Sequence, residues 1–404
     1  MFISDNEPTS GASVVIGVLF ALVFAILIAS VIQTQVVPVE EERTEYTHSN
    51  LVQQQMASLE NQIQSTAVND VVSSQPVSLG TSFQSRVVFG IFPIINSPDP
   101  SGQIQYQDFS ENVEFEGFQG EGGAEEFWDG TTKTYPTGQV SYEPTYRRYD
   151  DAPTTYYEHG ITYNEFNLDG NTRYSFLSDQ NIINDNNINL VTLGGDMNVA
   201  STQEITVNSN PVSAPSNTVA VEANNAQIRL PTNLDEDTWR NNLLDDEPRV
   251  EGVTKPNDDE VVIELQDGIY TMTLSRAFVS NQSSEVSTPS IYSTPDDLYI
   301  GWDQDQVILR EESRTQIDAQ VRDTYDNPVT GIPVYSYARD SSGACVGGFQ
   351  SGPVTGPQSC SAAVSQAGQQ TSTQDGEVTF VYESPRVDQD TSINVSLQFD
   401  DDDF

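Results

Sequence analysis

An unbroken apolar stretch near the N-terminus constrains this chain more than any other feature. Residues 12–32 include no charged residue, and a helix of these 21 residues would measure about 30 Å. That length is enough to cross the hydrocarbon core of a bilayer. The preceding residues hold Asp5 and Glu7 but no Lys or Arg, whereas a secretion signal usually begins with basic residues and has a shorter apolar core. The sequence therefore predicts a polar leader over residues 1–11 and a retained transmembrane helix over residues 12–33.

A second helical pattern follows the apolar stretch. Apolar residues recur at spacings of four, three, four and four, at Val52, Met56, Leu59, Ile63 and Ala67. This spacing places them on one face of an amphipathic helix, which we expect over residues 39–75 as a stalk. The apolar face can either pack on the globular part of the same chain or associate with other copies. The spacing does not distinguish packing on the same chain from association with other copies, because fewer than three clear heptads are present.

The balance of charges limits the partners of the chain. It has 60 acidic and 16 basic residues among 404, a formal net charge of −44. Because this charge repels phosphates, nucleic acid is excluded as a partner. Aromatic residues make up 9% of the chain and alternating Val/Ile-rich stretches are frequent, which indicates a folded rather than a disordered protein. We expect it to fold in molar salt, where the Debye length falls to about 3 Å and self-repulsion is screened.

The N-terminal layout resembles that of archaeal type IV pilin-like proteins. It has a polar leader, the small-residue step Ser-Gly-Ala-Ser at residues 10–13, an apolar helix and a polar helical extension. The scarcity of lysine beside abundant Asp and Glu is similar to that of haloarchaeal proteins. The resemblance implies membrane insertion with the bulk of the chain outside the cell, and it makes Gly11 and Ala12 candidate processing residues. Because Ser10 stands where a prepilin leader has a basic residue, we favour an anchor over a helix that polymerises.

Residues 76–300 carry short alternating runs separated by Gly, Asn, Asp and Pro. Runs at intervals of about 8 to 12 residues are typical of an acidic β-sandwich or barrel-like domain. Asp267-Gly268 lies between two such runs and predicts a hairpin. A tyrosine-rich stretch over residues 142–166 has two interpretations, a glycan-binding face or the rim of a β-domain whose hydroxyl groups find partners. This stretch and the whole layout resemble large haloarchaeal surface proteins of unassigned function.

Residues 301–404 resemble bacterial Ig-like domains of the invasin and intimin type. The resemblance rests on the segments "DTYDNPVTGIPV" and "DGEVTFVY". Asp326-Asn327-Pro328 and Asp375-Gly376 suit turns beside alternating strands. The resemblance implies a stiff extracellular spacer or an adhesive module. The expected fold class is therefore mainly β with a long N-terminal α-helix: a transmembrane and stalk helix, a β-sandwich-like domain and a C-terminal Ig-like β-sandwich.

Two further features fit an extracellular location. The only cysteines, Cys345 and Cys360, stand in a Gly/Ser-rich loop. Outside the cell they would form one disulfide that closes a loop of about 15 residues and stabilises the fold by ~3 kcal/mol, whereas in a reducing compartment they would be free thiols. Asn281 and Asn394 each begin an Asn-x-Ser triplet and are candidate glycosylation sites.

Sequence motifs for catalysis and cofactor binding are missing. His48 and His159 stand in different units and outside any His-Glu-x-x-His pair or Cys/His cluster. There is no nucleophile elbow and no phosphate-binding glycine loop. The acidic runs lack EF-hand spacing, so we interpret them as a solvated surface. We therefore expect no enzyme activity, no cofactor and no metal site.

The sequence thus predicts a single-pass membrane protein whose bulk is extracellular and whose role is structural or adhesive. Its partners would be membrane lipid around the N-terminal helix and an unknown surface ligand or cell-envelope partner, with self-association through that helix as a further option. Two alternatives stay open. One is a type IV pilin-like filament subunit or minor pilin, and the other is a surface hydrolase or glycan-binding protein with its site in residues 76–300.

Overall fold

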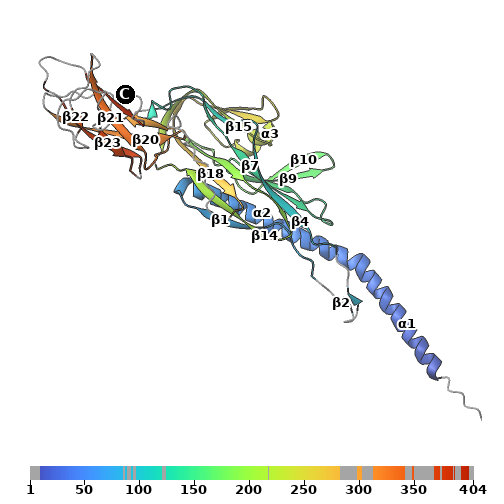
Figure 1. The fold of residues 1–404 in the computed structure, drawn as a ribbon. Coiled ribbons are helices and arrows are strands. Elements are labelled where there is room, and N and C mark those ends of the chain that lie inside the picture. The colour runs from blue at the N-terminus through green and yellow to red at the C-terminus, as the bar shows by residue number, and fades with distance from the viewer. Residues whose placement is uncertain are drawn as a thin grey trace, which may run out of the picture.

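The computed structural model has one long N-terminal helix followed by several β-sheets (Figure 1). Helix α1 (Ser10–Val31) passes into a π-helical turn, η1 (Ile32–Val36), and then into α2 (Val37–Asn69) without an intervening loop. The structure describes residues 10–84, 87–88, 92–93, 97–120, 124–216, 218–282, 298–302, 313–341, 348–349, 368–373, 375–384, 386 and 393–399.

Local sequence explains the junction and the end of this helix. Pro38 has no N–H to donate to the preceding turn, and the wider π-helical turn of η1 ends at Val36, two residues before it. Helix α2 ends at Asp70, whose backbone takes a left-handed conformation with φ of 54°. Such a residue commonly terminates a helix, because it turns the chain away from the helix axis.

Residues 73–282 supply the two large sheets of what we call the β-domain. The ten-stranded sheet contains β1 (Ser73–Ser78), β5 (Val113–Gly120), β6 (Lys133–Tyr135), β11 (Ile183–Asn184), β12 (Asn187–Asp196), β14 (Glu204–Ser213), β15 (Val219–Pro231), β16 (Val250–Thr254), β17 (Glu260–Leu265) and β18 (Gly268–Ser280). The six-stranded sheet contains β4 (Ser101–Asp108), β7 (Gly138–Thr145), β8 (Thr154–Glu158), β9 (Ile161–Leu168), β10 (Asn171–Phe176) and β13 (Asn198–Ser201). Pairing is antiparallel except between β12 and β18.

Two small elements lie between these strands along the chain. Strands β2 (Val87–Val88) and β3 (Phe92–Pro93) pair as a separate two-stranded antiparallel sheet. Helix α3 (Glu236–Thr238) and the π-turn η3 (Trp239–Leu243) connect β15 to β16. The side chain of Asp235 caps α3 by accepting a hydrogen bond from the Thr238 N–H at 2.6 Å.

Helix α2 contacts both large sheets and completes one hydrophobic core of the β-domain. Five of its apolar side chains are fully buried: Val52, Met56, Leu59, Ile63 and Ala67. They pack with Val77 and Val207 of the ten-stranded sheet and with Ile104 and Val140 of the six-stranded sheet. The amphipathic stripe is therefore covered by the β-domain of the same chain, which was one of the two alternatives that the spacing left open.

The C-terminal residues form two further sheets that share a core, which we call the C-terminal sandwich. The four-stranded sheet contains β19 (Leu298–Trp302), β20 (Arg314–Asp323), β22 (Gly348–Phe349) and β24 (Glu377–Glu383). The three-stranded sheet contains β21 (Pro333–Asp340), β23 (Gly368–Thr371) and β25 (Ile393–Gln398). Val321 and Phe380 of one sheet and Val334 of the other are fully buried in that core.

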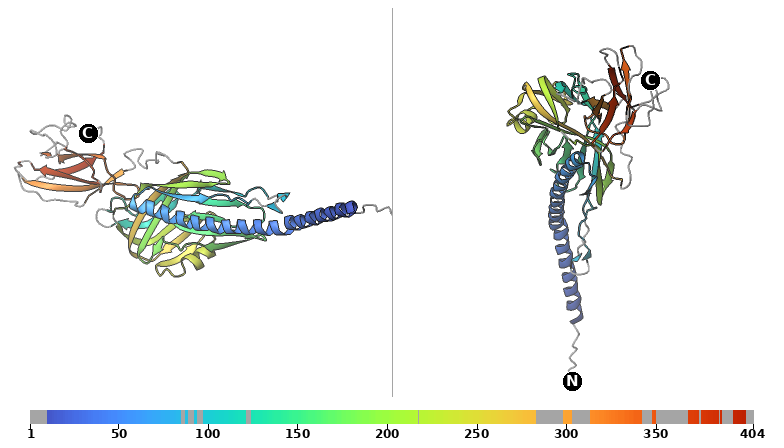
Figure 2. Two further views of the ribbon diagram at one scale, coloured as in Figure 1. Left: turned by 90° about the horizontal axis from the view of Figure 1, so that it is seen from below. Right: turned by 90° about the vertical axis from the view of Figure 1, so that its left-hand side faces the viewer.

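The helix and the C-terminal sandwich lie at opposite ends of an elongated molecule (Figure 2). The expected fold class, mainly β with a long N-terminal helix, is confirmed. The hairpin expected at Asp267-Gly268 is wrong. Strands β17 and β18 pair with the same strand, β15, in one uninterrupted register, with Gln227 opposite Glu264 and Ala223 opposite Gly268. The chain does not reverse direction between β17 and β18, because both strands pair with β15 and not with each other.

Candidate functional site: the apolar helix and its two junctions

Helix α1 is apolar on all sides and exposed. Phe20 and Phe24 have 71% and 65% of their surfaces exposed. Among the described residues, one helix is long and apolar enough to cross a membrane, and none of its most apolar window is buried. A secretion signal near the N-terminus would meet the same test of length and composition. The candidate processing residues, Gly11 and Ala12, lie in the first turn of α1.

The first turns of α2 are fixed to the β-domain by a buried carboxylate, Glu45. This side chain is completely buried. Its oxygens accept hydrogen bonds from three consecutive backbone N–H groups, those of Arg147, Arg148 and Tyr149, at 3.1, 2.8 and 2.9 Å. Such charge-assisted bonds are stronger than neutral ones. They hold the loop that follows β7 against the helix.

Glu41, one turn earlier, holds a second segment in the same way. Its carboxylate accepts hydrogen bonds from the Ser97 backbone N–H at 2.7 Å and from the Ser97 hydroxyl at 2.8 Å, and it pairs with the Arg148 guanidinium at 3.2 Å. Burial raises the pKa of Glu41, but the hydrogen bonds from Ser97 and Arg148 outweigh it, and the net pKa is lowered. The carboxylate is therefore ionised at neutral pH. Glu41 and Glu45 together fix the start of α2 in the β-domain.

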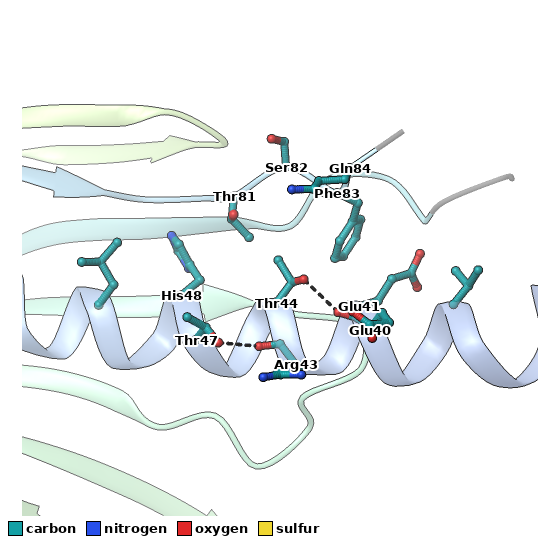
Figure 3. Close-up of a pocket in the computed structure, with 12 residues that line it drawn as sticks. Glu40, Glu41, Arg43, Thr44, Thr47, His48, Thr81, Ser82, Phe83 and Gln84 are labelled. Atoms are coloured by element: carbon teal, nitrogen blue, oxygen red, sulfur yellow. Dashed lines mark hydrogen bonds between the residues drawn. The ribbon is translucent and has the colours of Figure 1, made fainter. Parts of the chain in front are cut away.

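A groove of about 620 Å³ lies beside these residues, between α2 and residues 81–84 (Figure 3). Its lining mixes charged, hydroxyl and apolar side chains, among them Glu40, Arg43 and Phe83. The His48 imidazole points toward Thr81, and its Nδ1 lies 2.6 Å from the hydroxyl of Tyr146. Burial lowers the pKa of His48, so the imidazole is neutral at pH 7. The described lining residues offer no nucleophile paired with a base.

A second junction joins the β-domain to the C-terminal sandwich, and it is made by the turn after β20. Tyr325 is 3% exposed and belongs to the core of the β-domain rather than to that of its own sandwich. Its ring contacts Tyr135 at a centroid distance of 4.8 Å. Its hydroxyl lies 2.9 Å from the Thr192 hydroxyl and accepts a hydrogen bond from Arg276 at 3.1 Å.

Polar side chains on either side of Tyr325 complete this second junction. The Asn327 amide donates to the Ser213 hydroxyl and to the Leu274 carbonyl, both at 2.7 Å, and Ser213 in turn donates to Asp323 at 2.7 Å. The Trp128 indole donates to Asp326 at 3.2 Å, and the Tyr299 hydroxyl also donates to this carboxylate. Burial raises the pKa of Asp323 to about 6, above its ordinary value near 4.

This junction lies where the sequence predicted only a turn. The turn itself is confirmed: Asp326 donates its N–H to the Asp323 carbonyl at 2.9 Å and has a left-handed φ of 62°. Sequence reasoning missed that the turn inserts into another unit. The one available signal was a tyrosine between two acidic residues, since a large apolar ring in a turn is unusual unless something covers it.

Three of the six tyrosines in the tyrosine-rich stretch are internal, and the other three are partly buried. Tyr142, Tyr157 and Tyr163 are buried, and the Tyr142 hydroxyl donates to the Leu79 carbonyl at 3.1 Å. His159, at the tip of the β8–β9 hairpin, is also buried, and its Nε2 lies 2.6 Å from the Pro231 carbonyl. Buried rings are inaccessible to a sugar, so these residues help to build the β-domain.

The remaining predicted site residues lie apart from both junctions. Asn281 and Asn394 are exposed, as glycosylation would require. Cys345 and Cys360 lie outside the described residues, so the expected disulfide stays a prediction. Within the described part of the chain, no group of three or more His, Cys, Asp or Glu side chains is arranged to hold a metal ion.

Comparison with known proteins identifies no family for this chain. No protein-family model matches the chain, and no curated protein matches it. The fold and the two junctions therefore carry the functional argument on their own.

Proposed function

We propose that this chain is a non-enzymatic protein anchored in a cell membrane by α1, with the β-domain and the C-terminal sandwich outside the cell in a structural or adhesive role. One observation carries the proposal: the first part of a continuous helix is apolar and exposed, whereas its second part is fixed inside the β-domain. The resemblance of the N-terminal layout to archaeal type IV pilin-like proteins, and of the C-terminal residues to bacterial Ig-like domains, supports the same function.

The exposed surface of α1 needs a covering. Between Val14 and Val31, twelve large hydrophobic side chains are each at least half exposed. Full burial of such a side chain is worth about 1.5 to 3 kcal/mol, so transfer of α1 from water to lipid gains on the order of 20 kcal/mol. A helix that is apolar all round is suited to a lipid environment, because it has no polar face to turn toward water.

The two junctions suit a rigid surface protein. No loop separates α1 from α2, and Glu41 and Glu45 fix α2 in the β-domain. Tyr325 then fixes the C-terminal sandwich to the far end. The proposed role of this arrangement is to hold the sandwich at a constant position away from the membrane, where it can meet another surface or a cell-envelope partner.

A filament subunit is the second candidate. The same exposed helix favours it, because α1 can be buried against the α1 helices of other copies of the chain as well as in lipid. Fractionation separates the two candidates. We expect the protein to stay with membranes through high-salt and carbonate washes, to be released by detergent, and to lose its β-domain to external protease. Recovery in regular sheared fibres would favour the filament subunit. A soluble protein whose N-terminus lies beyond Ile32 would contradict both, because the stretch would then be a secretion signal.

A variant pair tests the role of α1 directly. We expect Leu22→Arg combined with Val23→Arg to weaken retention in membranes, since a charged residue near the centre of a span costs about 2.5 to 3.5 kcal/mol. The matched control is Tyr46→Arg, which changes an exposed residue of α2 outside the span. Equal retention of both variants would argue against an anchor.

A further inference from the structure

A group of polar residues lies between α2 and the β8–β9 hairpin, beside an otherwise apolar core. Tyr157 of β8 is paired with Thr162 of β9 across the antiparallel ladder, so their side chains lie on the same face of the sheet. Tyr157 packs in the core that α2 completes, and this face is therefore turned toward the helix. From α2, the Gln64 amide donates hydrogen bonds to the Glu60 carboxylate at 3.3 Å and to the Gly160 carbonyl at 3.2 Å. We call these five residues the polar seam.

Three oxygen atoms of the polar seam are buried without a hydrogen-bond partner. They are Oε2 of Glu60, the hydroxyl of Tyr157 and the hydroxyl of Thr162. Glu60 is 5% exposed, and the other two residues are fully buried. Buried polar atoms in native proteins are nearly always paired, because an unpaired one has lost its water and gained nothing in return. Three such atoms in one place indicate that they share a partner from outside the chain.

The charge of Glu60 also lacks compensation. Within the described residues, no Lys or Arg side chain forms an ion pair with this carboxylate. Burial raises the pKa of Glu60, and the nearby hydroxyls of Thr162 and Ser178 offset this only in part. Burial also raises the pKa of Tyr157, and the charge of Glu60 raises it further, so the Tyr157 hydroxyl stays neutral. An ionised carboxylate in this place therefore requires a positive partner.

The partner has to satisfy both requirements at once. A proton on Glu60 neutralises the charge but serves only one oxygen atom. A water molecule reaches several oxygen atoms but leaves the charge unpaired. A hard cation does both, since it is held by several oxygen ligands together. Because the seam holds one carboxylate, a singly charged cation leaves it neutral, whereas a divalent cation would leave an excess positive charge.

We propose that the polar seam binds one alkali-metal cation, which the Glu60 carboxylate holds together with the hydroxyl oxygens of Tyr157 and Thr162. The inference does not depend on the proposed membrane anchor. Its consequence is a bridge between α2 and the β8–β9 hairpin, made by an ion rather than by a side chain. The stability of the β-domain then depends on which cation is present, in addition to the general screening of charge that any salt provides.

Thermal unfolding of the full-length, detergent-solubilised protein at constant ionic strength tests the proposal. Potassium chloride, and in a second series sodium chloride, replaces tetramethylammonium chloride step by step. Screening then stays constant, and the four methyl groups of tetramethylammonium keep oxygen ligands away from its charge. Above the Kd, each tenfold rise in K⁺ or Na⁺ should raise the Tm by about 4 °C in at least one series, because tenfold in ligand equals about 1.4 kcal/mol.

Three variants assign the response to the polar seam. Glu60→Gln should abolish it, because the variant has no charge for the cation to neutralise. The matched control is Glu42→Gln, which removes an exposed carboxylate of the same helix and should respond like the parent. Thr162→Val keeps the size of the side chain and removes one oxygen ligand, so its response should move to a higher cation concentration.

Three outcomes would overturn the cation site. A parent protein with the same Tm in all three salts would assign the seam to a buried water. A response that persists in Glu60→Gln, or that is unchanged in Thr162→Val, would place the cation elsewhere. Infrared difference spectra of parent and Glu60→Gln in potassium chloride decide the third: a carboxylic-acid carbonyl band lost in the variant would show that a proton neutralises Glu60, whereas loss of a carboxylate band supports the proposal.

Discussion

Replacing Tyr325 by alanine should destabilise the β-domain, although Tyr325 belongs in sequence to the C-terminal sandwich. The ring is 3% exposed and packs in the core of the β-domain, and its hydroxyl makes two hydrogen-bonding contacts there. Truncating a buried aromatic residue to alanine costs about 3 to 5 kcal/mol. At about 2 to 4 °C per kcal/mol for a domain of this size, the melting temperature of the β-domain should fall by about 10 °C.

The measurement is thermal unfolding in molar salt, followed by near-UV circular dichroism of the detergent-solubilised protein. Tyr325→Phe keeps the ring and removes the hydroxyl, so we expect it to cost only about 1 kcal/mol. Tyr46→Ala, at a residue that is 52% exposed on α2, is the matched surface control and should cost less than about 1 kcal/mol. If Tyr325→Ala melts like Tyr46→Ala, then the turn after β20 does not insert into the β-domain, and the argument for a rigid junction is refuted.

Three further predictions concern charged groups. Glu45→Gln should lower the free energy of unfolding by about 2 kcal/mol, because it presents an NH₂ group to backbone N–H donors; denaturant titration should show no such loss for the exposed Glu42→Gln. Burial raises the pKa of Asp323 to about 6, so the free energy of unfolding should fall by at most about 3 kcal/mol as the pH rises from about 4 to 6. Asp323→Asn should remove this pH dependence. Unfolding titrations in which parent and variant keep a constant difference over that range would contradict the prediction. Dialysis from molar to ~0.1 M salt, which lengthens the Debye length to about 10 Å, should unfold the β-domain because the charge is −44, and an unchanged near-UV spectrum would argue against that.

The pH prediction follows from the sign of the pKa shift. A carboxyl group whose pKa is raised by folding binds more protons in the folded state than in the unfolded state between the two pKa values. Raising the pH through that interval therefore removes stability. For Asp323 the interval runs from about 4, the ordinary value for an aspartate, to about 6 in the folded protein. Asparagine has no proton to lose, so the variant lacks this contribution.

The sequence by itself determined the features that depend on near neighbours. An uncharged apolar run of 21 residues predicts a long helix without reference to the rest of the chain. Spacings of three and four likewise place Val52, Met56 and Leu59 on one face of a helix, whatever covers that face. The alternating strand expected after Asp375-Gly376 is present as residues 377–383, and its apolar residues Val378, Phe380 and Tyr382 are all buried. Such periodicities follow from backbone geometry alone.

Tertiary structure decided everything that depends on which distant segments meet. The stripe of α2 fits a partner helix or a sheet equally well, and only the assembled sheets show that they cover it. Asp267-Gly268 reads as a hairpin locally, yet β15 pairs on both sides of it and keeps the chain straight. The Asp326 carboxylate meets the Trp128 indole across 198 residues of sequence. No local pattern encodes such contacts, because burial and pairing arise only when the packed elements exclude water together.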